Sequence, residues 1–500
     1  MTLKYTAVVL AAVQALILVW FEYTVREALT IENGFSVDRL SFVMILLAVA
    51  IGLIISLYAL QYMKDFRFLV PMVLAVCAMA GIAASNNLLW MYFFWQLATV
   101  SAFFLIRYEE RPEAARNALK ALCMNLLGGL GFVLAIVFFG TYHYNIELGG
   151  LPVCLLVFAG MTKAAQMPFN SWLPGLKEAP QPVAALLCSM AEVTAGAFLI
   201  LKLAPALGFH LPGVMVMITG GVTFLITSLL AASQEKAAGM LVYSTSATMG
   251  LVIAFCGLGT YSAVWAAIMI LIIHTVTKPF LFLCAEASEE KPVFAVFMMV
   301  GIAGAFLAPL GILITKWPAL VAFIDSKNIL LIMCICFGSA ATVFYWTKWL
   351  GKTAVYAAAA EKIETGDGLT GVSSTDVSLN KLLALSVFGL ITVGGCLLFP
   401  LVSKAAAVPY LEGIFISEYL FAIPEGSTNI IWVTIAIIVS LPVIFCVKTK
   451  TKTIPANMSV DNKPVLIFNE LKMNIIGGVV NSVVIVSIFS IMLAVAWEAK

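Results

Sequence analysis

Long runs of apolar residues, separated by short polar breaks, recur along the 500-residue chain. Many of these runs hold roughly 18 or more almost uncharged residues, and a helix of that length crosses the ~30 Å hydrocarbon core of a bilayer. The pattern predicts an all-α polytopic membrane protein with about 14–15 transmembrane helices. The predicted spans are 5–22, 39–61, 68–84, 86–106, 117–141, 151–167, 182–204, 212–232, 239–257, 261–285, 293–323, 328–350, 381–403, 428–447 and 474–497.

The composition excludes a soluble globular protein. Hydrophobic residues make up 62% of the chain and charged residues 11%, and the mean hydropathy is +1.06, whereas about a quarter of a typical globular domain is charged. The net charge is +2, and the basic residues lie between predicted spans rather than in one patch, so no nucleic-acid partner is expected. No small-residue cleavage site follows the first apolar run, which indicates a retained span.

Because successive spans cross the membrane in opposite directions, the segments between them lie alternately on its two sides, and one side has many more lysine and arginine residues than the other. The richer side is expected to face the cytoplasm, which predicts a multi-pass protein of the inner (plasma) membrane with a cytoplasmic N-terminus and an external C-terminus. The predicted cytoplasmic set is Lys64, Arg67, Arg107, Arg111, Arg116, Lys120, Lys177, Lys236, Lys291, Lys348, Lys352, Lys448, Lys450 and Lys452. The opposite side carries Arg26, Arg39, Lys202, Lys327 and Lys404.

No stretch has the size or composition of a soluble catalytic domain. Residues 351–380 contain GDGLTGVSSTD and predict a polar cytoplasmic linker, and residues 448–472 form a second cytoplasmic connection. No glycine-rich phosphate loop follows a strand, and the ten cysteines include no Cys-x-x-Cys pair, so iron–sulfur ligation within this chain is not expected. We therefore expect no catalytic centre and no metal site in this chain.

Lys163 is the first candidate functional residue, because it lies within an apolar helix that two prolines interrupt. Pro168 and Pro174 each remove a backbone donor and break the helix beside the charge. An ionisable residue inside the membrane next to a broken helix is by default a candidate functional site. The alternative is a lysine near a helix end whose amine extends to the lipid headgroups.

His274 and Lys278 form a second candidate, in the apolar stretch ILIIHTVTKPFLFL. They lie four residues apart and therefore share one face of a helix. Histidine exchanges protons near neutral pH, so the pair is favoured as two steps of a proton path. The alternative is a hydrogen-bonded core histidine beside an anchoring lysine.

A third candidate is Lys316, which follows Pro309 in the apolar stretch AGAFLAPLGILITKW. A proline-broken hydrophobic segment with a buried lysine thus occurs twice, at Lys163 and at Lys316. Paired interrupted helices in two halves of a chain are typical of transporters built from inverted repeats.

Several motifs of the chain resemble motifs of one family, and they occur in the same order as in that family. They are KAAQMPFNSWLPGLKEAPQPVAALL from Lys163, DRLSFVMILL from Asp38, SNNLLWMYFFWQLATVSAFFLI from Ser85, HTVTKPFLFL from His274 and APLGILITKW from Ala308. The chain resembles, from about residue 38 to 325, the antiporter-like proton-conducting subunits of respiratory complex I, multisubunit cation/proton antiporters and energy-converting membrane hydrogenases.

The resemblance implies a bundle built on two inverted five-helix repeats, each with a broken helix. It divides the chain into N-terminal helices 1–66, a first repeat 67–204, a second repeat 205–350, the linker 351–380 and C-terminal helices 381–500. It also implies a proton pathway through the middle of the membrane. In that pathway Lys163 matches the lysine of the first broken helix, His274 and Lys278 the relay pair, and Lys316 the lysine of the second broken helix.

Two departures from the family pattern concern the partners of Lys163. The glutamate usual after the tryptophan of WQLATVS is replaced by Gln96, which cannot ionise, and the usual histidine on the following helix is replaced by Cys188. Glu192 lies one helical turn beyond Cys188. We hypothesise that Glu192 is the replacement counter-charge; the alternative is a glutamate that faces headgroups or a partner subunit.

The resemblance implies an ion-translocating subunit, for protons with sodium as an open alternative. Iron–sulfur clusters, and a nickel–iron centre or flavin, would then belong to partner subunits, together with other membrane subunits and a peripheral redox arm. The first interpretation is a subunit of an energy-converting hydrogenase or complex I-like oxidoreductase. The alternative is a cation/proton antiporter subunit without redox partners.

Overall fold

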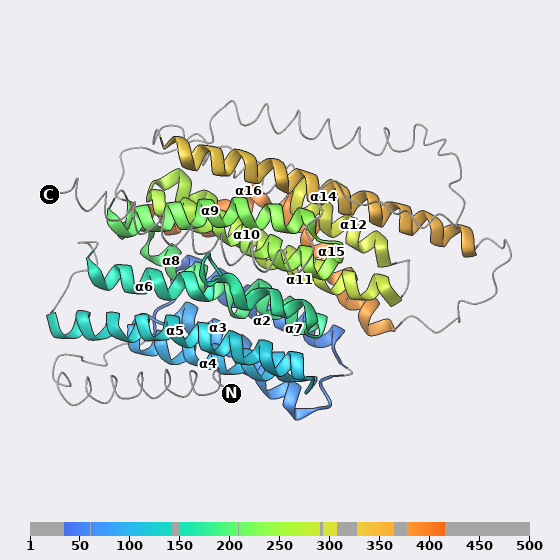
Figure 1. The fold of residues 1–500 in the computed structure, drawn as a ribbon, viewed down its shortest axis with the longest axis horizontal. Coiled ribbons are helices and arrows are strands. Elements are labelled where there is room, and N and C mark those ends of the chain that lie inside the picture. Colours follow the sequence, from blue (N-terminus) through green and yellow to red (C-terminus); the bar gives the residue numbers. More distant parts are fainter. Residues whose placement is uncertain are drawn as a thin grey trace. The chain divides into compact units, whose positions relative to one another are not determined.

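The computed structural model describes residues 35–60, 62–142, 150–208, 210–290, 294–307, 328–364 and 378–415. Helices account for almost all of this part of the chain (Figure 1). They are α2 (Arg39–Tyr58), α3 (Phe66–Ala84), α4 (Leu88–Arg107), α5 (Pro112–Tyr142), α6 (Leu151–Lys163), the 3₁₀-helix η3 (Phe169–Glu178), α7 (Gln181–Leu186), the π-helical turn η4 (Leu187–Ala191), α8 (Val193–Leu207), α9 (Leu211–Ser233), α10 (Ala237–Leu258), α11 (Tyr261–Glu290), α12 (Ala295–Ile302), the π-helical turn η6 (Ala303–Leu307), α14 (Ile329–Glu364), α15 (Leu379–Leu397), α16 (Phe399–Val402), the π-helical turn η7 (Ser403–Ala407) and α17 (Val408–Ile414).

Within the described ranges, 9 helices are long and apolar enough to cross a membrane. The prediction of an all-α polytopic membrane protein is therefore confirmed. Each apolar run predicted between residues 39 and 403 begins within a few residues of an observed helix. The predicted spans 5–22, 428–447 and 474–497 lie outside the described residues, as do Pro309 and Lys316.

Helix α14 is longer than its apolar run predicts. The predicted span ends at residue 350, whereas the helix continues to Glu364. The additional segment includes AAAAEKIE, and alanine, glutamate and lysine are strong helix formers. Local helix propensity therefore carries α14 into the stretch expected to be a linker.

The most deeply buried helices are α7–α8, α10 and α11. Two groups of helices pack around them: α3 packs between α2 and α4, and α5 between α4 and α6, while α9 packs between α10 and α14 (Figure 1). In the most apolar part of Gln181–Leu207, 100% of the residues are buried. The corresponding share is 89% for α10 and α11, but only 44% for α2 and α14. Glu192 at the start of α8, and His274 and Lys278 on α11, are consequently enclosed by protein.

Contacts of charged residues at the helix ends join groups that lie on the same predicted side of the membrane. Arg67 bonds Glu110 at 2.7 Å, and the Lys348 ammonium donates to the Ala232 carbonyl at 3.0 Å. Lys202, assigned to the opposite side, pairs with Asp38. Which of these ends faces the cytoplasm stays a prediction.

Helices α9 and α10 approach so closely that their backbones are in contact at glycine positions. A Cβ atom added at Gly220 would lie 2.5 Å from the Gly250 carbonyl oxygen and 2.6 Å from the Ala254 nitrogen. Gly213 and Gly257 make a second close contact of the same kind. Small residues at such contacts let helices associate in a membrane, where apolar burial alone does not drive them together.

We predict that Gly220→Ala destabilises the folded protein by about 1–3 kcal/mol, because the added methyl group forces apart two backbones that cannot adjust separately. Gly351→Ala is the matched control, since no atom lies within 4 Å of the corresponding Cβ position in α14. Both changes raise helix propensity by ~1 kcal/mol. Thermal unfolding in mild detergent should show a lower midpoint for Gly220→Ala alone; equal midpoints would contradict the proposed contact.

Candidate functional site

The helix that carries Lys163 ends at that residue, in the interior of the bundle. Helix α6 stops at Lys163, Ala165 adopts a left-handed conformation with φ of 52°, and the chain continues as η3. Pro168 immediately precedes η3 and Pro174 lies within it. Because neither proline has a backbone N–H to donate, an α-helix cannot continue through this stretch. The sequence-predicted break is present, and Lys163 lies at its start.

Three backbone carbonyl groups at the break accept hydrogen bonds from side chains. Such bonds matter because a carbonyl left unbonded in hydrocarbon costs several kcal/mol. Trp172 Nε1 donates to the Thr162 carbonyl at 3.1 Å, Gln166 Nε2 to that of Ala164 at 2.8 Å, and Ser246 Oγ to that of Ala165 at 2.8 Å.

The amine of Lys163 meets the carboxylate of Glu192 in the protein interior. Lys163 Nζ lies 2.7 Å from Glu192 Oε2, and both side chains are 0% exposed. The amine also donates to Thr99 Oγ1 at 3.0 Å and lies 4.8 Å from the centre of the Trp95 ring. Each charge is thereby compensated, which a buried ion requires.

Glu192 follows directly on the π-helical turn η4, where the helix contains an extra residue per turn. Such turns occur frequently at functional sites. The Cys188 carbonyl accepts a hydrogen bond from His274 Nε2 at 3.0 Å, and the Ser189 carbonyl accepts one from Thr194 Oγ1 at 2.5 Å. One turn of helix therefore joins the carboxylate that faces Lys163 to the imidazole of His274. The apolar pattern of the sequence gave no indication of this turn.

Gln96 occupies the position where the family pattern has a glutamate. It follows Trp95 on α4, and its amide donates to the hydroxyl of Tyr92 at 2.7 Å. The carboxylate that the structure brings to Lys163 is that of Glu192, from α8, and its oxygen lies inside the bundle rather than at a headgroup. Its role in transport stays a prediction.

His274 and Lys278 are both buried on α11, at 2% and 3% exposure. Lys278 donates to Ser244 Oγ and, at 3.5 Å, to the Leu241 carbonyl, and its amine lies 5.3 Å from the centre of the Trp346 ring. No carboxylate in the described part of the chain forms a salt bridge with Lys278. The two buried lysines therefore differ in kind, because one faces a carboxylate and the other faces hydroxyl, carbonyl and ring.

A small cavity of about 20 Å³ borders His274 and Lys278, with Thr277 and Tyr345 also in its wall. A cavity of this volume accommodates one water molecule. The Cys188 carbonyl can only accept a hydrogen bond, so His274 Nε2 carries a hydrogen. His274 Nδ1 has no hydrogen-bond partner among the residues described.

Helix α10 connects the two lysine sites through a short polar run, Ser244–Ser246. Ser244 bonds Lys278, while Ser246 bonds the carbonyl of Ala165 at the break of α6. These serines, like Thr99 on α4, were not predicted as site residues. The available signal was a cluster of polar residues within an otherwise apolar span.

Other predicted features are not tested here. Lys316 and Pro309 fall outside the described residues. Among the described residues, no group of three or more histidine, cysteine, aspartate or glutamate side chains is placed to hold a metal ion.

Comparison with known sequences shows similarity to membrane subunits of quinone oxidoreductases and Mrp antiporters. Residues 85–342 match the family described as NADH:quinone oxidoreductase/Mrp antiporter, TM, and residues 20–68 match the N-terminus of chain 5 of NADH-ubiquinone oxidoreductase (complex I). Chloroplastic NAD(P)H-quinone oxidoreductase subunit 5 of Piper cenocladum is 30% identical over 290 residues, which is 53% of this chain and 39% of the relative. The corresponding subunit of Oryza sativa is 32% identical, with the same coverage. The chain thus spans about two fifths of the length of these relatives.

Solved structures show the same fold at lower identity. The Mrp complex from Dietzia sp. aligns with a TM-score of 0.64 and 21% identity, over 96% of this chain and 60% of that one. An archaeal membrane-bound sulfane sulfur reductase aligns at 0.62 and 16% identity, over 83% and 94%. Respiratory complex I from Thermus thermophilus aligns at 0.60 and 20% identity, over 81% and 94%.

The family match covers more than half of the chain and includes Lys163, Glu192, His274 and Lys278. The chain belongs to the NADH:quinone oxidoreductase/Mrp antiporter family of antiporter-like membrane subunits.

Proposed function

We propose that this chain moves protons across the membrane as one subunit of a redox-driven complex. The observation that carries the proposal is the fully buried Lys163–Glu192 ion pair at the break of α6, joined through η4 to His274 and Lys278. Buried ionisable residues in membrane proteins mark ion and proton pathways. Family membership agrees with this function, since the matched family is described by NADH:quinone oxidoreductase and Mrp antiporter.

The buried ion pair provides a way to couple the movement of one proton to another. A proton that neutralises Glu192 leaves the ammonium of Lys163 without its counter-charge in a region where an isolated charge is costly. Lys163 then releases a proton to an acceptor. The neutral amine takes the proton of Glu192, which restores the ion pair and leaves the carboxylate ready to attract the next proton. The two groups exchange protons as a unit rather than independently.

His274 and Lys278 would form the continuation of the path. The imidazole is held by the Cys188 carbonyl through Nε2, and the His274 side chain borders a cavity together with Lys278. One water molecule in that cavity would bridge the groups by hydrogen bonds. By resemblance, Lys316 would follow toward the far side of the membrane.

The complex would contain further membrane subunits and a peripheral redox arm, with iron–sulfur clusters and a nickel–iron centre or flavin located there. The distribution of basic residues supports a plasma membrane location with a cytoplasmic N-terminus. A second candidate function is a cation/proton antiporter subunit without redox partners, which the fold similarity to an Mrp complex favours. In either function sodium would be the transported ion in place of the proton if a cluster of oxygen ligands formed a sodium site.

Purification of the complex from native membranes in mild detergent, followed by mass spectrometry and metal analysis, separates the two functions. Stoichiometric iron and acid-labile sulfide, with or without nickel, support the redox-driven complex. A metal-free assembly of small hydrophobic subunits supports the antiporter and rejects the redox assignment.

We predict that Glu192→Gln lowers proton translocation by at least roughly tenfold, because it removes the group that exchanges protons with Lys163. Lys163→Met should give a loss of similar size, and the double variant should be no worse than either single variant. Proton uptake is measured with a pH-sensitive dye in proteoliposomes that contain the complete complex. Glu113→Gln, a change at an exposed residue, serves as the control.

Stability measurements on the same variants distinguish a functional pair from a merely structural one. Removal of one partner of a buried pair costs about 3–5 kcal/mol, and removal of both costs less. We therefore expect the double variant Lys163→Met, Glu192→Gln to unfold at a higher temperature than Lys163→Met alone while it remains inactive. A stable double variant that still translocates protons would reject the role of the pair.

We predict that Lys278→Gln also abolishes translocation, whereas His274→Gln reduces it partly, because a water in the shared cavity still has Lys278 as a partner. Lys236→Gln, at an exposed lysine, is the control. Initial rates of dye quenching in proteoliposomes give the comparison. Wild-type rates in Lys278→Gln would remove Lys278 from the pathway.

A further inference from the structure

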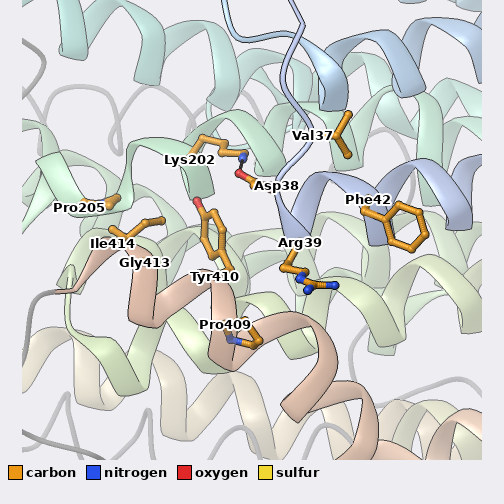
Figure 2. Close-up of a pocket in the computed structure, with 10 residues that line it drawn as sticks. All are labelled: Val37, Asp38, Arg39, Phe42, Lys202, Pro205, Pro409, Tyr410, Gly413 and Ile414. Carbon is orange, nitrogen blue, oxygen red and sulfur yellow. Dashed lines mark hydrogen bonds and ion pairs between the residues drawn. The ribbon is translucent and has the colours of Figure 1, made fainter.

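A cavity of about 720 Å³ lies away from the proposed pathway, where α2 begins, α8 ends and α17 packs against them. Figure 2 shows the side chains that surround it, with contributions from all three helices. The lining consists of Val37, Asp38, Arg39, Phe42, Lys202, Pro205, Pro409, Tyr410, Gly413 and Ile414. The cavity therefore has charged groups at one part of its wall and apolar side chains over the rest.

The charged groups of the cavity leave one positive charge in excess. Lys202 bonds Asp38, whereas Arg39 forms no ion pair within the described part of the chain (Figure 2). Burial acts to raise the pKa of Asp38, but the hydrogen bonds from Lys202 and Ser41, together with the charge of Lys202, outweigh it and hold this pKa below its usual value. Asp38 is thus ionised at neutral pH, and Arg39 is the charge that remains uncompensated.

Tyr410 supplies an unused hydrogen-bonding group at the same place. Its side chain is only 6% exposed, and its hydroxyl has no hydrogen-bond partner among the described residues. The Lys202 amine lies 5.0 Å from the centre of its ring, and the hydroxyl is turned toward the Lys202–Asp38 pair (Figure 2). A buried hydroxyl without a partner is unfavourable, and an acceptor in the cavity would satisfy it.

An apolar stripe continues from the cavity along the outer face of α2. Phe42 lines the cavity and is 57% exposed, and Leu46, Val49 and Leu53 follow at 57%, 44% and 66% exposure. Their spacing of three or four residues places them on one face of the helix. Because α2 is a membrane-spanning helix that begins at Arg39, the charged groups lie at the level of the headgroups and the stripe lies at the level of the acyl chains.

We propose that this cavity binds the phosphodiester headgroup of an anionic phospholipid, with one acyl chain along the stripe on α2. The guanidinium of Arg39 would contact the phosphate, as basic pockets between transmembrane helices do. Tyr410 would donate its hydroxyl hydrogen to a phosphate or glycerol oxygen. A zwitterionic lipid fits less well, because Asp38, the one carboxylate that the described residues contribute to the wall, is already bonded to Lys202.

Lipid retention by the purified complex tests this assignment. The complex is delipidated in detergent and then incubated with phosphatidylglycerol, phosphatidylcholine or glycerol 3-phosphate, and bound molecules are counted by native mass spectrometry. We expect phosphatidylglycerol to bind at least fivefold more tightly than phosphatidylcholine. Arg39→Gln should remove this preference, Tyr410→Phe should weaken the retention of phosphatidylglycerol, and Arg116→Gln, a change at an exposed arginine on α5 outside the cavity, should leave both unchanged.

Each of the other outcomes overturns the proposal. Equal retention of phosphatidylcholine would show a site for lipid chains alone, and equal binding of glycerol 3-phosphate would show a site for a soluble anion. Unchanged retention of phosphatidylglycerol in both variants would show that the lipid binds elsewhere. Tyr410→Phe removes only one oxygen atom from a packed ring, so its result stands even where Arg39→Gln prevents assembly.

Discussion

A membrane interior has no water to bond a free carbonyl or to solvate an isolated charge, and this constraint governs the centre of the molecule. An uninterrupted helix satisfies it by itself, but the break after Lys163 and the turn η4 do not. Side chains from four separate segments complete these bonds: Trp172 and Gln166 near the break, Ser246 from α10 and His274 from α11. The interrupted helices therefore depend on the helices packed around them, and the buried position of Gln181–Leu207 follows from that dependence.

The same constraint explains how a family position can change without leaving a bare charge. With Gln96 at the usual glutamate position, an ammonium at Lys163 needs another anion within hydrogen-bonding distance. Glu192 provides it from a different helix, and Thr99 supplies a further oxygen from the helix that carries Gln96. In this chain the carboxylate beside Lys163 therefore comes from the start of α8. It follows directly on the segment that contacts His274, so the ion pair and the imidazole share one piece of backbone.

Much of the fold could be predicted from the sequence because hydrophobic run length is a direct consequence of bilayer thickness. The helices between residues 39 and 403, and the break near Pro168, follow from apolar runs and missing donors. The end of α14 did not follow, because its last residues are held by helix propensity rather than by hydrophobicity. The turn η4 did not follow either: it is a feature of hydrogen-bond register, and nothing in LCSMAE differs from an ordinary buried helix. The hypothesis that pairs Lys163 with Glu192 rests on the family resemblance, with its departures at Gln96 and Cys188, and on the spacing of Glu192 from Cys188; the 2.7 Å distance comes only from the packing of α6 against α8.

The two buried lysines have different partners, and this difference has a physical consequence for any path between them. Lys163 faces the carboxylate of Glu192, so an ammonium there has a full counter-charge within hydrogen-bonding distance. Lys278 faces a serine hydroxyl, a carbonyl and the Trp346 ring, which provide only dipoles and a ring face. An ammonium at Lys278 therefore depends on dipoles and a ring face for its stabilisation, whereas an ammonium at Lys163 depends on the ionised carboxylate of Glu192. In the function that we propose, protonation of Glu192 would remove the counter-charge of Lys163, and the turn η4 would link that change to His274 on α11.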